Sequence, residues 1–151
     1  TNNYKNMGND GIIVLNADNA DSNALIPTVK SQLKLFSRTK KASVYLDGEV
    51  IKRGETEVLN INDIKIPGMH NVENYMAAIA AVEGLVPDEI IRSVAKDFGG
   101  VPHRIELVRE KDGVKYYNSS IDSSPNRTIN ALKVFKQKMK LVEILTCTTP
   151  L

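Results

Sequence analysis

The sequence is poor in aromatic residues and in the side chains that bind metals through sulfur or imidazole. Among its 151 residues there is no tryptophan, aromatic residues make up 5%, and Cys147 is the only cysteine. A single cysteine excludes a disulfide framework and a cluster of thiolate ligands. Because His70 and His103 are the only histidines, a histidine-rich metal site is excluded as well. Any hydrophobic core must therefore be built from Ile, Leu, Val and Ala.

A strong net charge and long apolar runs are also missing. Twenty basic against eighteen acidic residues give a formal net charge of +2, and the basic residues do not form the stripe that nucleic-acid binding requires. No apolar run approaches the length of a membrane span, and the first residues lack a secretion-signal pattern. The sequence therefore predicts a cytoplasmic protein without nucleic-acid or membrane partners. A small anionic ligand remains compatible with it.

The first third of the chain predicts a strand followed by a weak helix. "GIIVLNADN" (11–19) is a short apolar run typical of a buried strand, and its polar exit at Asn16 and Asp18 should face a ligand or a turn. Residues 23–33 are weakly helical, and Pro27 is acceptable there only in a first turn.

The next segment predicts a hairpin and a further strand. Residues 42–54 form two alternating stretches about Asp47-Gly48, a turn that favours positive φ at both central residues. Residues 57–68 continue as a strand.

Two helices follow in the sequence. The first is predicted over 71–84. The second enters at Pro87 and ends at Gly99, a suitable left-handed terminator. One apolar face of the second helix is predicted to be buried, and it consists of Ile90, Ile91, Val94, Ala95 and Phe98.

After residue 104 the pattern changes. A second Asp-Gly hairpin is predicted, with strands near 105–110 and 114–118, and then a helix with Ser124 as its cap and Pro125 in its first position. The predicted buried stripe of that helix is Ile129, Leu132 and Phe135. Residues 138–145 begin another strand. This order opens a βαβ unit, so the chain resembles the end of one domain joined to the start of another.

The first of the two central helices opens with a pair of amides. Asn71 and Asn74 lie three residues apart, on one face, directly after His70. One amide can cap the helix, and the other can simply be solvated, but together they favour a ligand. The same choice applies to Arg104, which is either a surface ion-pair residue or a ligand contact. No catalytic role is assigned to either histidine.

Three stretches, "GMHNVENYMAA", "FGGVPHRIELV" and "GVKYYNSSIDSSPNRTI", together resemble the Mur ligase family. The resemblance runs from roughly residue 4 to residue 140. The H-N-x-x-N helix start and the G-x-x-H-R junction, about thirty residues apart, are specific as a pair.

The resemblance implies an α/β fold divided between two domains. Residues 1–101 would be the latter part of a central ATPase domain, with a mixed sheet, hairpins and helices. Residues 102–151 would be the beginning of a Rossmann-like C-terminal domain that binds an amino acid. The resemblance is to the branch that adds D-glutamate to UDP-N-acetylmuramoyl-L-alanine. In that reaction ATP converts the substrate carboxylate into an acyl phosphate, which the amino group attacks.

The resemblance also implies site residues. Asn71 and Asn74 would hold the adenine of ATP, because an amide offers a donor and an acceptor together. Arg104 would contact ribose or phosphate, for which a guanidinium fork is suited. Ser119 takes the place of the family's usual Asp on the ribose. Only the adenine and ribose side of ATP is expected here, and the family's Mg²⁺ ligands and carbamoylated lysine lie upstream.

Several departures from the family follow. No G-x-x-G-K-[ST] phosphate loop occurs in the sequence, Ile121 stands where many members have Lys, and Asp122 stands where a small residue is usual. The chain is therefore expected to be a fragment that is inactive alone. The alternatives are a non-catalytic nucleotide-binding or oligomerising module and another member such as a folate polyglutamate ligase. Apolar faces, namely Ile12 to Leu15, Ile90, Ile91 and Val94, are expected to lack part of their cover, so the chain is expected either to self-associate across them or to rearrange its N-terminal strand to cover them.

Overall fold

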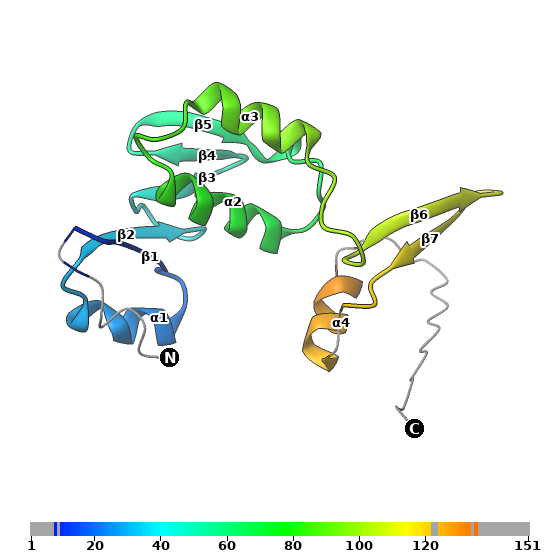
Figure 1. The fold of residues 1–151 in the computed structure, drawn as a ribbon, viewed down its shortest axis with the longest axis horizontal. Helices are drawn as coiled ribbons and strands as arrows, with labels where there is room; N and C mark the ends of the chain where they lie inside the picture. The colour runs from blue at the N-terminus through cyan, green and yellow to red at the C-terminus, as the bar shows by residue number, and fades with distance from the viewer. Residues whose placement is uncertain (1–7, 9, 122–123, 134, 136–151) are drawn as a thin grey trace. The chain divides into compact units, whose positions relative to one another are not determined.

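The chain divides into two compact units, Thr1–Gly100 and Val101–Leu151. A computed structural model describes residues 8, 10–121, 124–133 and 135 (Figure 1). The assignment of the units to the two family domains stays a prediction.

Unit 1 is built on a mixed five-stranded sheet, which confirms the predicted α/β class. The strands follow the order β1-β2-β3-β4-β5; β1, β2 and β3 are parallel, and β3, β4 and β5 are antiparallel. Their bounds are β1 Ile12–Asn16, β2 Gln32–Ser37, β3 Val44–Asp47, β4 Val50–Arg53 and β5 Thr56–Asn60.

The connection from β1 to β2 differs from the sequence prediction. Helix α1 (Ala20–Leu25) begins earlier than expected because Asn19 caps it, its side chain accepting from the amide of Ser22. Pro27 then lies in a short 3-10 turn. Strand β2 was not predicted, although "QLKLFS" alternates polar and apolar residues over its first four positions, as a half-buried strand does.

The first predicted hairpin is confirmed, but its turn lies one residue later. Asp47 pairs with Val50, so Gly48 and Glu49 form the loop. Only Gly48 has a positive φ, of 59°, so the expectation of positive φ at both central residues is wrong. Glycine in the first loop position is the placement found in a type II′ turn. Strand β5 also ends earlier than predicted, because a 3-10 turn occupies Ile61–Asp63.

Helix α2 (Met69–Ala81) starts and ends earlier than the predicted 71–84. Gly68 occupies the N-cap position with φ 106°, so the interpretation of Asn71 as the cap is wrong. The helix lies against β1, β2 and β3. Its buried residues are Val72, Met76, Ile79 and Ala80.

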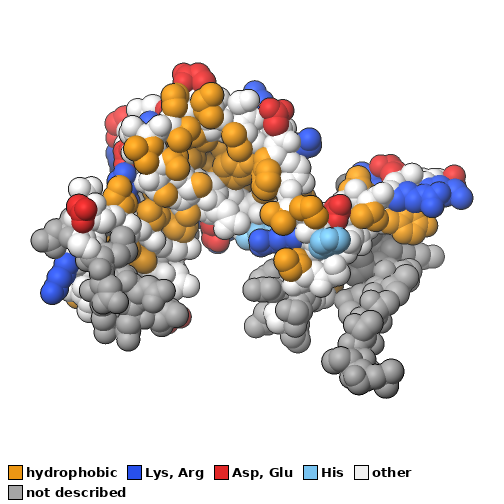
Figure 2. All heavy atoms as spheres, viewed as in Figure 1, with side chains coloured by type: hydrophobic (Ala, Val, Ile, Leu, Met, Phe, Trp, Pro, Cys, Tyr) orange, Lys and Arg blue, Asp and Glu red, His pale blue; other side chains and the backbone are white. Residues whose placement is uncertain are grey.

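Helix α3 (Asp88–Asp97) is confirmed, but only part of its predicted apolar face is buried. Ile91 and Ala95 are buried, while Ile90, Val94 and Phe98 are 53%, 49% and 41% exposed. The helix contacts β5 and the 3-10 turn after it. These two elements cover only part of the apolar face that the sequence predicted to be buried. Figure 2 shows hydrophobic side chains gathered on the surface over this helix. The positive φ after the helix belongs to Gly100 (100°), so Gly99 is not the left-handed terminator.

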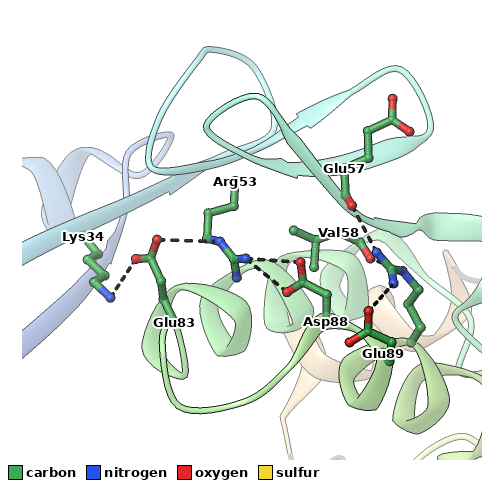
Figure 3. A network of polar contacts seen from close by, with 8 residues as sticks. Lys34, Arg53, Glu57, Val58, Glu83, Asp88 and Glu89 are labelled. Carbon is green, nitrogen blue, oxygen red and sulfur yellow. Dashed lines mark hydrogen bonds and ion pairs between the residues drawn. The ribbon is translucent and has the colours of Figure 1, made fainter.

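Polar side chains fasten α3 to the sheet (Figure 3). Arg92 donates to the carbonyls of Val58 and Glu57 at 2.8 and 3.2 Å, which satisfies acceptors of the edge strand β5. Arg53 donates to both carboxylate oxygens of Asp88 at 3.1 and 3.2 Å. Both bonds come from the single nitrogen Nη2, so the contact is a three-centre hydrogen bond between charged groups. A further carboxylate, Glu83, lies between Arg53 and Lys34 at 3.6 and 2.8 Å.

Unit 2 begins with the second predicted hairpin. Strands β6 (Glu106–Lys111) and β7 (Val114–Asn118) are antiparallel. Asp112 and Gly113 between them have φ of 53° and 76°, as a type I′ turn requires. This hairpin is confirmed at the turn position that the sequence predicted.

Helix α4 (Pro125–Leu132) follows Ser124, which takes the cap position as predicted but makes no side-chain cap hydrogen bond. The predicted stripe is only partly correct, because Ile129 is 48% exposed and Ala131 is buried instead. The ring of Phe135 packs on Tyr117, with centroids 4.8 Å apart. The strand predicted over 138–145 lies outside the described residues.

The two sides of α3 provide a test of this core. Ile91→Ala should lower the free energy of unfolding by about 2–4 kcal/mol, because it removes buried side-chain volume. Ile90→Ala, on the same helix, should change it by no more than about 0.5 kcal/mol. Urea unfolding of both variants measures the difference, and equal losses would contradict the described burial.

Candidate functional site

The first predicted site residue, Asn71, lies in the first turn of α2, where its side chain makes a hydrogen bond within the protein. The amide nitrogen Nδ2 of Asn71 donates to the carbonyl of Pro67 at 2.7 Å, and its backbone N–H donates to the carbonyl of Gly68 at 2.9 Å. Asn71 is therefore tied back to the loop that enters the helix. One of the two amides has a structural partner.

The second amide is held only weakly. Asn74 is exposed, and its Nδ2 lies 3.5 Å from Oδ1 of Asn71, which is the outer limit of a hydrogen bond. Among the described residues, Oδ1 of Asn74 makes no hydrogen bond. The side chain thus offers both an acceptor and a donor to a ligand. An adenine base presents the complementary pair, an amino donor beside a ring-nitrogen acceptor.

The predicted residues Arg104 and Ser119 come together in unit 2. The backbone N–H of Ile105 donates to Oγ of Ser119 at 3.2 Å, and the N–H of Ile121 donates to the carbonyl of His103 at 3.3 Å. The turn that contains Arg104 is therefore held against the turn that follows β7.

The backbone on both sides of Arg104 is strained. His103 and Ile105 have φ of 67° and 49°, and this region is unfavourable for a β-branched residue. Strain of this kind persists only where the surroundings impose it. Here Glu106 accepts from the backbone N–H of His103 at 2.8 Å, and the ring Nδ1 of His103 lies 2.9 Å from Nδ2 of Asn118.

These contacts fix the backbone on both sides of Arg104, and none of them involves the Arg104 side chain. Arg104 is exposed, and its guanidinium makes no ion pair with any described residue. The interpretation of Arg104 as a surface ion-pair residue therefore has no support among those residues. The amide pair and the Arg104 turn lie in separate units.

A polar cluster at the carboxyl ends of β1 and β2 was only partly predicted. Asp18 was expected to face a ligand or a turn, and it faces a turn. Its carboxylate accepts from Oγ of Ser37, the N–H of Arg38 and Oγ1 of Thr39, each at 2.6 Å. Burial raises the pKa of Asp18, but these hydrogen bonds outweigh it and hold the pKa below its usual value.

The same cluster contacts helix α2, which carries Asn71 and Asn74. Nε of Arg38 lies 2.7 Å from Oε1 of Glu73, the residue directly before Asn74. The sequence analysis missed this pair, because no local pattern connects two charges 35 positions apart. The carboxyl ends of parallel strands are also where open α/β sheets bind their ligands.

Metal and membrane features are absent from the described part of the chain. No group of three His, Cys, Asp or Glu side chains there could hold a metal ion. No helix in that part is long and apolar enough to cross a membrane.

Comparison with known proteins decides the family. Residues 4–82 match the Mur ligase middle domain. The chain belongs to the Mur ligase family. The resemblance drawn from the sequence motifs is thereby confirmed.

Three curated relatives of this Mur ligase chain share one name. The UDP-N-acetylmuramoylalanine--D-glutamate ligase of Ruminiclostridium cellulolyticum is 47% identical over 145 residues, covering 92% of this chain and 31% of the relative. The ligase of the same name from Acetivibrio thermocellus is 47% identical over 136 residues, covering 86% and 29%. That from Clostridium beijerinckii is 43% identical over 144 residues, covering 92% and 30%. The chain thus spans about a third of the length of these relatives.

A solved structure shares the fold. It is described as a UDP-N-acetylmuramoyl-L-alanyl-D-glutamate--2,6-diaminopimelate ligase, and it matches with a TM-score of 0.58 at 22% identity. The match covers 83% of this chain and 28% of the solved chain. At that identity the match supports the Mur ligase fold and not the choice of substrate.

The hydrogen bonds of Asp18 predict an acid-dependent loss of stability. Folding lowers the pKa of Asp18. The ionised carboxylate therefore contributes to the free energy of unfolding above the pKa of an unfolded Asp, near 3.9, and this contribution is lost as pH falls through the folded pKa. Asp18→Asn should therefore cost about 1 kcal/mol at neutral pH and should flatten the fall of unfolding free energy below about pH 4.

Urea unfolding at a series of pH values measures this effect. Asp97→Asn is the control, because its carboxylate receives one long hydrogen bond, from Ser93 at 3.4 Å. Lowered pKa values of Asp47 and Glu55 act equally in both variants. An Asp18→Asn curve parallel to that of the parent would contradict the assignment.

Proposed function

We propose that this chain is the nucleotide-side portion of an ATP-dependent ligase that joins D-glutamate to UDP-N-acetylmuramoyl-L-alanine in peptidoglycan precursor synthesis. The observation that carries the proposal is the 41–47% identity to relatives bearing the name of that ligase, across most of this chain. The other family member considered, a folate polyglutamate ligase, is the alternative to this proposal.

The proposed reaction has two steps. The carboxylate oxygen of UDP-N-acetylmuramoyl-L-alanine attacks the γ-phosphorus of ATP, and ADP leaves. The amino group of D-glutamate then attacks the acyl carbon, phosphate leaves, and the amide bond is complete. Both steps depend on positioning and on stabilising charge. The sequence contains no G-x-x-G-K-[ST] loop, so catalysis by these 151 residues alone is not part of the proposal, and Mg²⁺ is assigned no ligand among them.

The role proposed for the amide pair is recognition of the adenine. Asn74 accepts from the amino group of the base and donates to the adjacent ring nitrogen, because both of its polar atoms are available. Asn71 has a structural role instead, since its own Nδ2 is engaged with the carbonyl of Pro67 and its Oδ1 makes only the 3.5 Å contact with Asn74. This division of labour refines the sequence prediction, which gave both amides the same role.

The role proposed for unit 2 is contact with the ribose and phosphate. The strained turn fixes the backbone from which the Arg104 side chain extends. A guanidinium binds phosphate and hydroxyl oxygens through several N–H donors. Ser119, whose Oγ accepts from the backbone N–H of Ile105, is assigned the ribose contact only because it takes the place of the family's usual Asp. A serine is a weaker acceptor here than the carboxylate that the family usually carries. Because ATP and the nucleotide-sugar substrate are intracellular metabolites, the proposed location is the cytoplasm.

The adenine assignment is tested by titrating the ¹⁵N-labelled chain with adenosine and with ATP. We expect a dissociation constant on the order of millimolar, about 4 kcal/mol, because no phosphate loop contributes. Asn74→Ala should weaken binding by about 1–3 kcal/mol by removing both contacts to the base.

The matched control is Asn62→Ala, because Asn62 is another exposed asparagine, bonded to Glu49 at 2.9 Å. It should leave adenosine affinity unchanged. Chemical-shift changes confined to residues distant from 71, 74 and 104 would rule out the assignment.

A second candidate function is a non-catalytic nucleotide-binding module that self-associates. The observation in its favour is the exposed apolar row of α3, formed by Ile90, Val94 and Phe98. Rows of this kind often mark contact surfaces. Of the residues predicted to drive association, Ile13 and Ile91 are buried and are not available for it.

Sedimentation at several concentrations tests this candidate. If the module self-associates through α3, the mass should rise with concentration and Val94→Ser should return it to that of a monomer. A strictly monomeric chain at every concentration would exclude the candidate.

A further inference from the structure

We propose that Asp18, Arg38 and Glu73 form a positioning relay, which fixes the first turns of α2 against the strand ends and so places Asn74 for its ligand. The proposal rests on the proposed adenine site for its functional consequence. Its structural part stands on contacts within unit 1 alone. None of the three residues is a catalytic residue, because none is argued to touch a reacting atom.

The relay starts where β1 ends. The backbone N–H of Asp18 donates to Oδ1 of Asn16 at 2.9 Å, which fixes the position of residue 18 relative to the strand. Asn16 and Phe36 are partners in the parallel ladder of β1 and β2, so the two strands end side by side. The carboxylate of Asp18 thus reaches across from the exit of one strand to the exit of its neighbour.

The second step is the turn after β2. Asp18 accepts from three donors of residues 37–39, and the hydroxyl of Ser37, a fully buried residue, accepts from the N–H groups of Thr39 and Lys40 at 3.1 and 3.0 Å. These bonds leave the turn little freedom. Because the N–H of Arg38 is one of the donors, the backbone from which the Arg38 side chain departs is set by Asp18.

The third step crosses to α2. Arg38 binds Glu73 through Nε at 2.7 Å. The two side chains are 39% and 29% exposed, and an ion pair at that exposure contributes little to stability. The helix is instead anchored by the buried Met76 and Ile79. The pair is therefore dispensable for folding, and its effect is on where the beginning of the helix lies.

That position matters because Asn74 must meet the edge of a base. A binding side chain loses much of its contribution when it is displaced by about 0.5 Å from the productive geometry. Asn74 has only the 3.5 Å contact to Asn71 to orient it. The backbone of the first turns must therefore supply the precision, and Glu73 is the adjacent residue through which Arg38 holds that backbone.

A charge-reversal experiment tests the relay in the full chain. Arg38→Ala and Glu73→Ala should each shift the side-chain amide resonance of Asn74 in the ¹⁵N-labelled chain without nucleotide. Each should also weaken adenosine binding about three- to tenfold, as mutations outside a binding site can. The double variant Arg38→Glu with Glu73→Arg should restore the resonance, and should restore the affinity to within about twofold. Lys96→Ala, which removes the exposed pair with Asp63, is the matched control and should change neither quantity.

The outcomes separate the relay from the adenine site. If the single variants weaken binding and the reversed pair does not restore it, Arg38 or Glu73 contacts the nucleotide directly and the relay is overturned. If the single variants leave the Asn74 resonance unchanged, the relay is overturned as well. If the parent chain fails to bind adenosine, the proposed function fails, and the resonance in the nucleotide-free chain still decides the relay. Urea unfolding confirms that each variant folds.

Discussion

Met76 and Ile79 lie fully buried between α2 and the sheet, and the other features of unit 1 depend on that contact. The helix packs across β1, β2 and β3 at once, so it holds the parallel part of the sheet together from one side. The same burial directs the opposite face and the N-terminal turn of the helix outward. Asn71, Glu73 and Asn74 are presented at the surface because the neighbouring Val72 and Met76 must face the core.

The polar residues of unit 1 are organised around this packed layer. At the carboxyl ends of β1 and β2, Asp18 closes a turn and Arg38 extends from it to α2. Elsewhere Arg53 and Arg92 fasten α3 to β4 and β5. The first set connects the strand ends to the helix turn that holds Asn74. The second set satisfies backbone acceptors of β5 and pairs Arg53 with the carboxylate of Asp88. Ion pairs and hydrogen bonds thus connect α2 to the strand ends in one place and attach α3 to the sheet in the other.

The comparison of sequence and structure is clearest in the turns and helices. The Asp112-Gly113 hairpin follows from local chemistry, because few residues other than glycine, asparagine and aspartate tolerate two successive positive φ angles. The Asp47-Gly48 hairpin was predicted on the same ground, but only Gly48 has a positive φ, and the loop begins one residue later because the pairing of β3 with β4 sets the register. Helix α3 was found from its periodicity, yet Ile90, Val94 and Phe98 are exposed. A repeating apolar pattern predicts a helix and does not state how wide a strip its neighbours cover.

The sequence by itself determined the family, the α/β class, both Asp-Gly hairpins, the existence of α2, α3 and α4, and the candidate residues Asn71, Asn74, Arg104 and Ser119. These depend on motifs and on interactions between residues close in the chain. Only the tertiary structure decided that Asn71 is engaged with Pro67 while Asn74 is available, that Ser119 holds the Arg104 turn through Ile105, and that Asp18 connects to Glu73 through Arg38. The second and third depend on contacts between residues that are distant in the sequence and that the fold brings together, and the first depends on the exact geometry of the turn that enters α2. A hydrogen bond is decided by a few tenths of an ångström, and distances of that kind are set by packing and not by position in the sequence.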